Sequence, residues 1–170
     1  MSSERSKRSS SASGQSGTRH VVFWVGQRCL SLSIEVVREV VDLRQLTSVP
    51  MAPPAVLGII SLRGTILSVV DAEYVLSGTH RAGGIGRVLV LVRDSAVVAA
   101  LAIDRVLGVV ALPEGGFLHN HAATADPFVL GHHDLGPTGL VAVLDPSALF
   151  HHVDSQRFAA SLERSVVPPE

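Results

Sequence analysis

Residues 53–71 read PPAVLGIISLRGTILSVVD, and this stretch decides the fold of the chain. Two apolar runs rich in β-branched residues, Leu57–Leu62 and Thr65–Val70, flank the dipeptide Arg63-Gly64. Such runs on either side of a short glycine-containing break predict a β-hairpin with a tight turn. The two prolines that open the stretch cannot take part in a central strand, so a loop is expected before the hairpin.

Strand-like runs continue on both sides of this hairpin, separated by turn residues. The expected strands are His20–Val25, Cys29–Ile34, Val88–Val92, Ala96–Ile103 and Val106–Leu112, followed by Phe128–Leu130 and Leu140–Leu144 around a polar, glycine-containing turn. Residues 113–127 are expected to form a loop. The pattern of Glu35–Leu43 suits either one helical turn or a bent strand, and Ser155–Val166 has the apolar spacing of a terminal helix. Residues 1–18 contain almost no apolar side chains and predict a disordered serine-rich tail.

Three short patterns recur in the same order in the two halves of the chain. They are Ile34-Glu35-x-Val37-x-x-Val40 with Ile103-Asp104-x-Val106-x-x-Val109, Val56-Leu57-Gly58 with Val129-Leu130-Gly131, and Val70-Asp71 with Leu144-Asp145. This self-similarity predicts two related β units, over residues 20–78 and 86–152. Each unit is too short for a large sandwich, whereas a small barrel closes its own edge strands. Two such barrels would leave an apolar groove between them, which is a common docking place for a partner.

The charge balance and the cysteine content exclude several classes of function. The chain has 14 basic and 15 acidic residues, which argues against a nucleic-acid binder and against attachment to an anionic membrane surface. Its single cysteine, Cys29, cannot form an internal disulfide and fits a reducing compartment. The mean hydropathy is +0.37, but Asp104 and Arg105 divide the most apolar region, Ala96–Leu112, into runs of strand length rather than a membrane span.

Histidine is the residue type that could carry enzymatic chemistry, and the chain has 8 histidines. His119, His121 and the pairs His132-His133 and His151-His152 are the candidate metal ligands. Adjacent histidines on a strand point to opposite faces, and no metalloprotease, zinc-finger, nucleophile-elbow or phosphate-loop spacing occurs in the sequence. Histidines in solvated loops are therefore favoured over a metal site, and no cofactor is expected.

Two pairs of charged residues each allow two interpretations. Asp71 and Asp145 occupy equivalent repeat positions and could do acid–base work as a pair, but their placement in separate units favours caps or turn formers. Arg63 could be an ordinary hairpin arginine in water, or a guanidinium held rigidly for a partner's carboxylate or carbonyl. Glu39, set among valines, is its complement in charge, and the residues alone leave both interpretations of Arg63 open.

These residues resemble the CheW-like family of bacterial chemotaxis coupling proteins. Residues 53–64 are similar to the family's signature, in which a proline precedes a glycine, two apolar residues and Asn-Leu-Arg-Gly. Residues 33–40 look like a family segment with a valine and a glutamate between apolar residues, and residues 65–71 are similar to the segment directly after the signature in the family. Residues 103–106 and 143–145 look like landmarks of the second half, so the resemblance runs from His20 to His152.

The resemblance implies an all-β fold of two small five-stranded SH3-like β-barrels with a hydrophobic groove between them and short helices at the linker and the C-terminus. A CheW-like domain would span residues 19–154, with one barrel over 20–78 and 146–154 and the other over 86–145, before a helix and tail over 155–170. The implied function is a non-catalytic cytoplasmic scaffold, recruited to membrane receptor arrays. It would couple the cytoplasmic tip of a methyl-accepting chemoreceptor to the regulatory domain of a CheA-type histidine kinase. Val37, Glu39, Gly58, Arg63 and Gly64 fall on the implied receptor-binding side, and no kinase-binding residue is assigned.

Three positions depart from the family's pattern. The asparagine of the signature is Ser61 here, a proline after the turn is Ser68, and the leucine after Val-Asp is Ala72. These departures predict a divergent member and leave two alternatives open. One is an adaptor that binds only one of the two partners in a non-standard chemosensory system, and the other is a small metal-dependent enzyme that uses residues 119–133.

Overall fold

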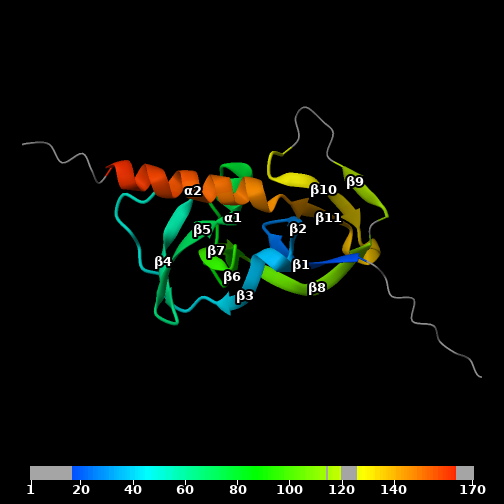
Figure 1. Ribbon diagram of the computed structural model, residues 1–170, viewed down its shortest axis with the longest axis horizontal. Helices are drawn as coiled ribbons and strands as arrows, with labels where there is room; N and C mark the ends of the chain where they lie inside the picture. Colours follow the sequence, from blue (N-terminus) through cyan, green and yellow to red (C-terminus); the bar gives the residue numbers. More distant parts are fainter. Residues whose placement is uncertain (1–16, 114, 120–125, 164–170) are drawn as a thin grey trace, which may run out of the picture.

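The strands form two sheets, which lie side by side in Figure 1. The computed structural model describes residues 17–113, 115–119 and 126–163, with side chains as far as Ser155. Barrel A is the six-stranded sheet, in the order β8-β1-β2-β11-β10-β9, and barrel B is the five-stranded sheet, in the order β3-β6-β7-β5-β4. The strands are β1 (Gly17–Val25), β2 (Arg28–Ser33), β3 (Val37–Asp42), β4 (Val56–Leu62), β5 (Thr65–Asp71), β6 (Arg87–Arg93), β7 (Ala96–Ile103), β8 (Arg105–Pro113), β9 (Phe117–His119), β10 (Val129–Asp134) and β11 (Leu140–Leu144). The helices are η1 (Ile34–Val36), α1 (Ala72–Ser77), η2 (Gly136–Thr138) and α2 (Pro146–Glu163).

The all-β fold with two SH3-like barrels and few helices is confirmed. The hairpins β1–β2, β4–β5 and β6–β7 all form where short apolar runs flank turn residues. Both interpretations of Glu35–Leu43 hold in part, because the 3-10 turn η1 leads directly into β3. One of the two sheets has a sixth strand, β9, which has three residues and lies within the expected loop over 113–127.

The two sheets divide the chain differently from the two expected sequential units. β1 and β2 belong to barrel A, where β1 pairs with β8 and β2 runs parallel to β11. Barrel A therefore combines residues 17–33 with residues 105–144, and barrel B is formed by residues 37–103. The expected division at residues 78–86 is wrong for the sheets, because an alternating apolar pattern predicts a hairpin but does not identify the strand that pairs with its outer edge.

Two element boundaries also differ from expectation. β10 extends through His132 and His133, where a turn was expected, because its residues alternate between buried and exposed despite their polarity. α2 begins at Pro146 rather than at Ser155, and Asp145 accepts a hydrogen bond from the backbone N–H of Ser147 at this start. The expected serine-rich tail lies outside the described residues except for Gly17 and Thr18, which begin β1.

Backbone pairing outside the regular strands joins the two ends of barrel B. After β3, Thr47 forms an isolated antiparallel bridge with Ile59 of β4. The N–H of Thr47 donates to the carbonyl of Ile59 at 3.0 Å, and the N–H of Ile59 donates to the carbonyl of Thr47 at 2.8 Å. Because β3 and β4 are the edge strands of the sheet, this bridge connects its two edges.

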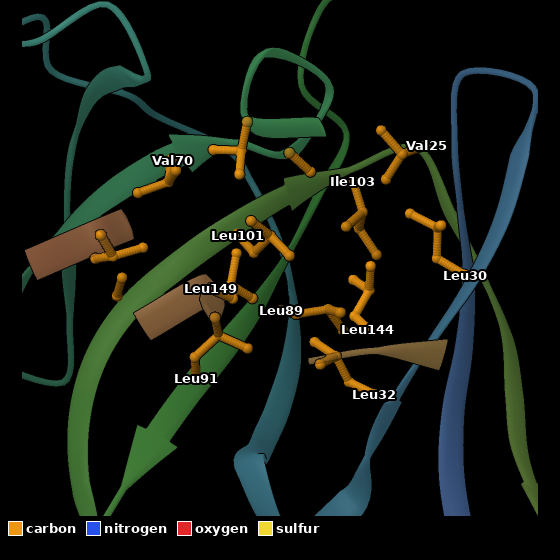
Figure 2. Close-up of a cluster of buried hydrophobic side chains, with 14 of the residues drawn as sticks. Val25, Leu30, Leu32, Val70, Leu89, Leu91, Leu101, Ile103, Leu144 and Leu149 are labelled. Carbon is orange, nitrogen blue, oxygen red and sulfur yellow. The ribbon is translucent and has the colours of Figure 1, made fainter. Parts of the chain in front are cut away.

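An apolar core shared by both sheets and α2 fills the space between them, as Figure 2 shows. Its labelled side chains come from barrel A, barrel B and α2: Val25, Leu30, Leu32, Val70, Leu89, Leu91, Leu101, Ile103, Leu144 and Leu149. A second cluster lies on the other face of barrel B, and a smaller one on the other face of barrel A. The shared core makes the two barrels one packed structure, because each buries apolar area that would otherwise be exposed to water.

Polar contacts also connect the barrels, at the ends of β1 and β7. Asp104 accepts a hydrogen bond from the backbone N–H of Gly26 at 2.6 Å, and its other oxygen pairs with the guanidinium of Arg81. These residues line a polar cavity of about 480 Å³ together with Glu73 and the glycine-rich segment after Arg81. No helix in the described part of the chain is both long and apolar enough to cross a membrane.

Candidate functional site

The turn between β4 and β5 places Arg63 and Gly64 at the tip of a two-residue hairpin. Arg63 has a φ of 48° and Gly64 a φ of 82°, and positive φ at both central residues is typical of a type I′ turn. The right-handed twist of this turn matches the twist of the strands that it joins. The arginine therefore projects from a short, well-defined backbone rather than from a long loop.

Arg63 forms a two-pronged ion pair with Glu39 on β3. Its Nη1 donates to Glu39 Oε1 at 2.7 Å, and its Nη2 donates to Oε2 at 2.9 Å. The Arg63 side chain is 71% exposed and the Glu39 side chain only 23%. An exposed pair contributes about 0–1 kcal/mol to stability, so its main physical effect is to fix the direction of the guanidinium. The sequence suggested only that the two charges are complementary, and the structure brings them into contact.

Gly58 lies in β4, and the segment with Leu46 and Thr47, which closes barrel B, passes directly over it. A Cβ atom at this position would overlap the carbonyl oxygen of Thr47 and approach Leu46 Cγ to 3.0 Å. Glycine is therefore required here by the close approach of a second backbone. This geometry gives Gly58 a structural role, and its expected contact with a receptor stays a prediction.

Val37 and Gly64 differ in their surroundings. Val37 pairs with Leu91 of β6, is partly buried and packs against the shared core. Gly64 is exposed, and no atom lies within 4 Å of the position where its Cβ would be. All five residues expected at the receptor side thus belong to barrel B, but only Glu39 and Arg63 contact each other through their side chains.

Exposed apolar side chains on barrel B were missed by the sequence analysis. Ile66 on β5 is 62% exposed, and Val40, next to Glu39 on β3, is 41% exposed. Ile66 stands in an apolar run of the kind that usually marks a buried strand, so the local pattern gave no sign of its exposure. Exposed apolar side chains on the same barrel as an exposed arginine are typical of a surface that binds a protein.

The two aspartates that could have formed an acid–base pair are instead helix caps. The Asp71 carboxylate is fully buried and accepts hydrogen bonds from the backbone N–H groups of Glu73 and Arg81 at 3.1 and 3.3 Å. Asp145 accepts from the N–H of Ser147 at 2.8 Å at the start of α2. Each carboxylate thus caps a helix start, and Asp71 also holds the N–H of Arg81 in the segment after α1.

The histidines do not form a metal centre within the described residues. His132 is half-buried and His133 is 6% exposed, on opposite faces of β10, as the strand geometry requires. No group of three histidine, cysteine or acidic side chains is positioned to hold a metal ion in the parts of the chain that the structure describes. His121 lies outside those parts. Burial lowers the pKa of both His20 and His152 and raises the pKa of the Cys29 thiol, so none of the three has the environment of an activated group.

Comparisons with known proteins agree with the fold and with the sequence pattern. The family model "CheW-like domain" matches residues 19–154. A relative described as "Chemotaxis protein CheW", from Rhizobium meliloti (strain 1021), is 31% identical over 90 residues, which are 53% of this chain and 58% of that protein. The chain therefore aligns with less than two thirds of this relative's length. The crystal structure of the scaffolding protein TtCheW from Thermoanaerobacter tengcongensis matches with a TM-score of 0.65 at 26% identity, over 76% of this chain and 89% of that chain. The chain belongs to the CheW-like family of chemotaxis adaptor and scaffold proteins.

Proposed function

We propose that the protein is a non-catalytic scaffold that couples the cytoplasmic tip of a methyl-accepting chemoreceptor to a CheA-type histidine kinase at membrane receptor arrays. The observation that carries this proposal is the Glu39–Arg63 pair, held at 2.7 and 2.9 Å on a closed barrel of a CheW-like chain. An arginine whose guanidinium already donates two hydrogen bonds to one carboxylate retains further N–H donors for a partner. A receptor tip made of helices offers acceptor oxygens and apolar side chains to such a surface.

The neighbouring apolar residues support a protein partner. Val40 and Ile66 present apolar surface on the same barrel as the ion pair. Arginine is among the residue types that most often dominate the binding energy of a protein interface. We assign receptor binding to Val37, Glu39, Gly58, Arg63 and Gly64, with Glu39 and Arg63 in direct contact and Val37 and Gly58 shaping the barrel beneath them. Kinase-binding residues are left unassigned.

The decisive experiment reverses each charge of the pair and then both together. Binding of the purified full-length protein to a receptor cytoplasmic fragment is measured by co-sedimentation or calorimetry. Arg63→Glu is expected to weaken binding at least tenfold, since it removes the donors and places two carboxylates side by side. The double variant, Glu39→Arg with Arg63→Glu, restores an ion pair in which the two charges have changed places. It should therefore recover the stability of the fold but not receptor binding.

Arg87→Glu provides the matched control. Arg87 forms an exposed ion pair with Asp42 at 2.9 Å on the same barrel, so its reversal makes the same change in net charge. It should leave receptor binding within about twofold of the unchanged protein, because exposed pairs of this kind contribute little. Undiminished receptor binding by folded Arg63→Glu protein would refute the site. Val37→Asp is a poorer probe, because Val37 packs on the shared core and an aspartate there would also destabilise the fold.

Binding to the kinase regulatory domain is measured on the same variants. The coupling role requires one protein to bind both partners at once, so a ternary complex of receptor fragment, scaffold and kinase domain is expected. If the unchanged protein binds the kinase domain but no receptor fragment, the adaptor with a single partner is the correct description instead. Binding of neither partner would refute both versions.

A further inference from the structure

The inner face of barrel A carries polar groups that the proposed function does not use. Along β1, Val21, Phe23 and Val25 belong to the shared core, so His20, Val22 and Trp24 point to the opposite face. Val22 packs there with Cys29 of β2 and Val141 of β11, and Trp24 lies against them. His133 of β10 is paired with Val141 and therefore shares this face.

Three of the residues on this face are polar and almost completely buried. His20 is 8% exposed, His133 is 6% exposed and Ser31 is 0% exposed. Neither His20 Nδ1 nor Ser31 Oγ has a hydrogen-bond partner among the described protein atoms. A buried polar group without a partner is costly, and a buried imidazolium would be more so. The buried and unpartnered site of His20 therefore disfavours the charged form of its imidazole.

Within the described part of the chain, no carboxylate is among the groups that shift the pKa of His20. The titratable groups near this face are His133 on β10, Cys29 on β2, Arg105 on β8 and, through the ring of Phe117, His119 on β9. None of them is a carboxylate, and Asp134 points to the exposed side of β10. Burial, followed by the neighbouring His133, lowers the pKa of His20 below its ordinary value.

Barrel A also has less apolar interior of its own than barrel B. Among the described residues, the separate cluster of barrel A contains three buried residues, and the separate cluster of barrel B contains seven. One of its edge strands, β9, has only three residues. The strands of barrel B contain no histidine at all. Regions with fewer buried apolar contacts open at lower free energy than the rest of a structure, so an acid effect on this face would act on barrel A first.

We propose that the interior of barrel A is an acid-sensitive element, in which protonation of His20 opens barrel A while barrel B stays folded. Because the opened form binds a proton at His20 more readily than the folded form does, the open population grows as the pH falls. Full stability is present above the pH at which a free histidine titrates, about 6.5, and is lost below it. For one titrating histidine, the ratio of open to folded barrel A rises by about tenfold per pH unit. The acid response belongs to barrel A alone and does not depend on which partners the protein binds.

The chain contains its own reporter for the test. Trp24 is the single tryptophan and lies on the same face of β1 as His20. The pH of the full-length protein is lowered from 7.5 to 5.0, and Trp24 emission is followed together with backbone amide NMR signals. We expect a red shift of Trp24 emission and loss of native signals from β1, β2 and β10 below pH 6.5, while signals from β5, β6 and β7 persist.

Variants separate the effect of His20 from that of His152, which is half-buried. His20→Gln and His20→Phe remove the titrating group with a polar and an aromatic replacement, so that at least one should fold, and each should move the Trp24 transition to lower pH by half a unit or more. His152→Gln is the matched control, because burial also lowers the pKa of His152 but this residue lies on α2. Three results would overturn the proposal: simultaneous loss of both barrels, an unchanged spectrum down to pH 5.0, or the same transition in every folded His20 variant.

Discussion

Replacing Gly58 by alanine should weaken the closure of barrel B by an amount that follows from the structure. The added methyl group would overlap the carbonyl oxygen of Thr47 and lie 3.0 Å from Leu46 Cγ. The atom in the way belongs to the backbone, so the clash cannot be relieved by rotating a side chain. The segment that carries Thr47 must move away from β4, and the bridge between Thr47 and Ile59 must lengthen or break.

The cost can be worked out from the two hydrogen bonds of this bridge, which measure 3.0 and 2.8 Å. Each backbone hydrogen bond contributes about 0.5–1.5 kcal/mol, so losing both lowers the free energy of unfolding by about 1–3 kcal/mol. For a chain of this size, 2 kcal/mol corresponds to a fall in Tm of about 4–8 °C. Thermal unfolding followed by circular dichroism, with urea unfolding as a second measurement, resolves such a change.

Two other glycines provide controls. Gly83 has no positive φ, and no atom lies within 4 Å of the place where its Cβ would stand. Gly83→Ala should therefore change the free energy of unfolding by no more than about 0.5 kcal/mol relative to the unchanged protein. Gly64 has equally open surroundings but a φ of 82°, so Gly64→Ala isolates the cost of a positive φ, about 1 kcal/mol. A Gly58→Ala protein as stable as Gly83→Ala would refute the close approach. Normal stability combined with lost receptor binding would instead assign Gly58 to direct partner contact.

Two further substitutions test the capping and core assignments. Asp71→Ala removes the acceptor for the N–H groups of Glu73 and Arg81 and leaves both donors in a buried place, so unfolding in urea should show a loss of about 1–3 kcal/mol. An unchanged urea midpoint would contradict the capping role. Phe23→Ala creates a cavity in the shared core, where Phe23 is fully buried, and should cost about 3–5 kcal/mol by the same measurement. A loss below about 1 kcal/mol would mean that the two barrels do not share one packed core.

Local chemistry determined the hairpins and their turns. The run of β-branched residues on each side of Arg63-Gly64 specifies two strands and the turn between them, because alternation and turn residues act over only a few positions. The caps at Asp71 and Asp145 follow from the same short range, since each carboxylate accepts from the N–H two residues ahead at a helix start. The resemblance to CheW-like proteins also rested on contiguous residues, and the family match over residues 19–154 agrees with it.

The tertiary structure decided which strands are neighbours and which side chains meet. The pairing of β1 with β8 and of β2 with β11 joins segments far apart in the sequence, and no short pattern encodes such a choice. The repeat therefore predicted two units correctly but divided the chain between them wrongly. His133 was expected in a polar turn and lies inside barrel A, because alternation along β10 directs it inward despite its polarity. Arg63 and Glu39 were known from the sequence as complementary charges, but only the folding of β3 against the β4–β5 hairpin brought them to 2.7 Å.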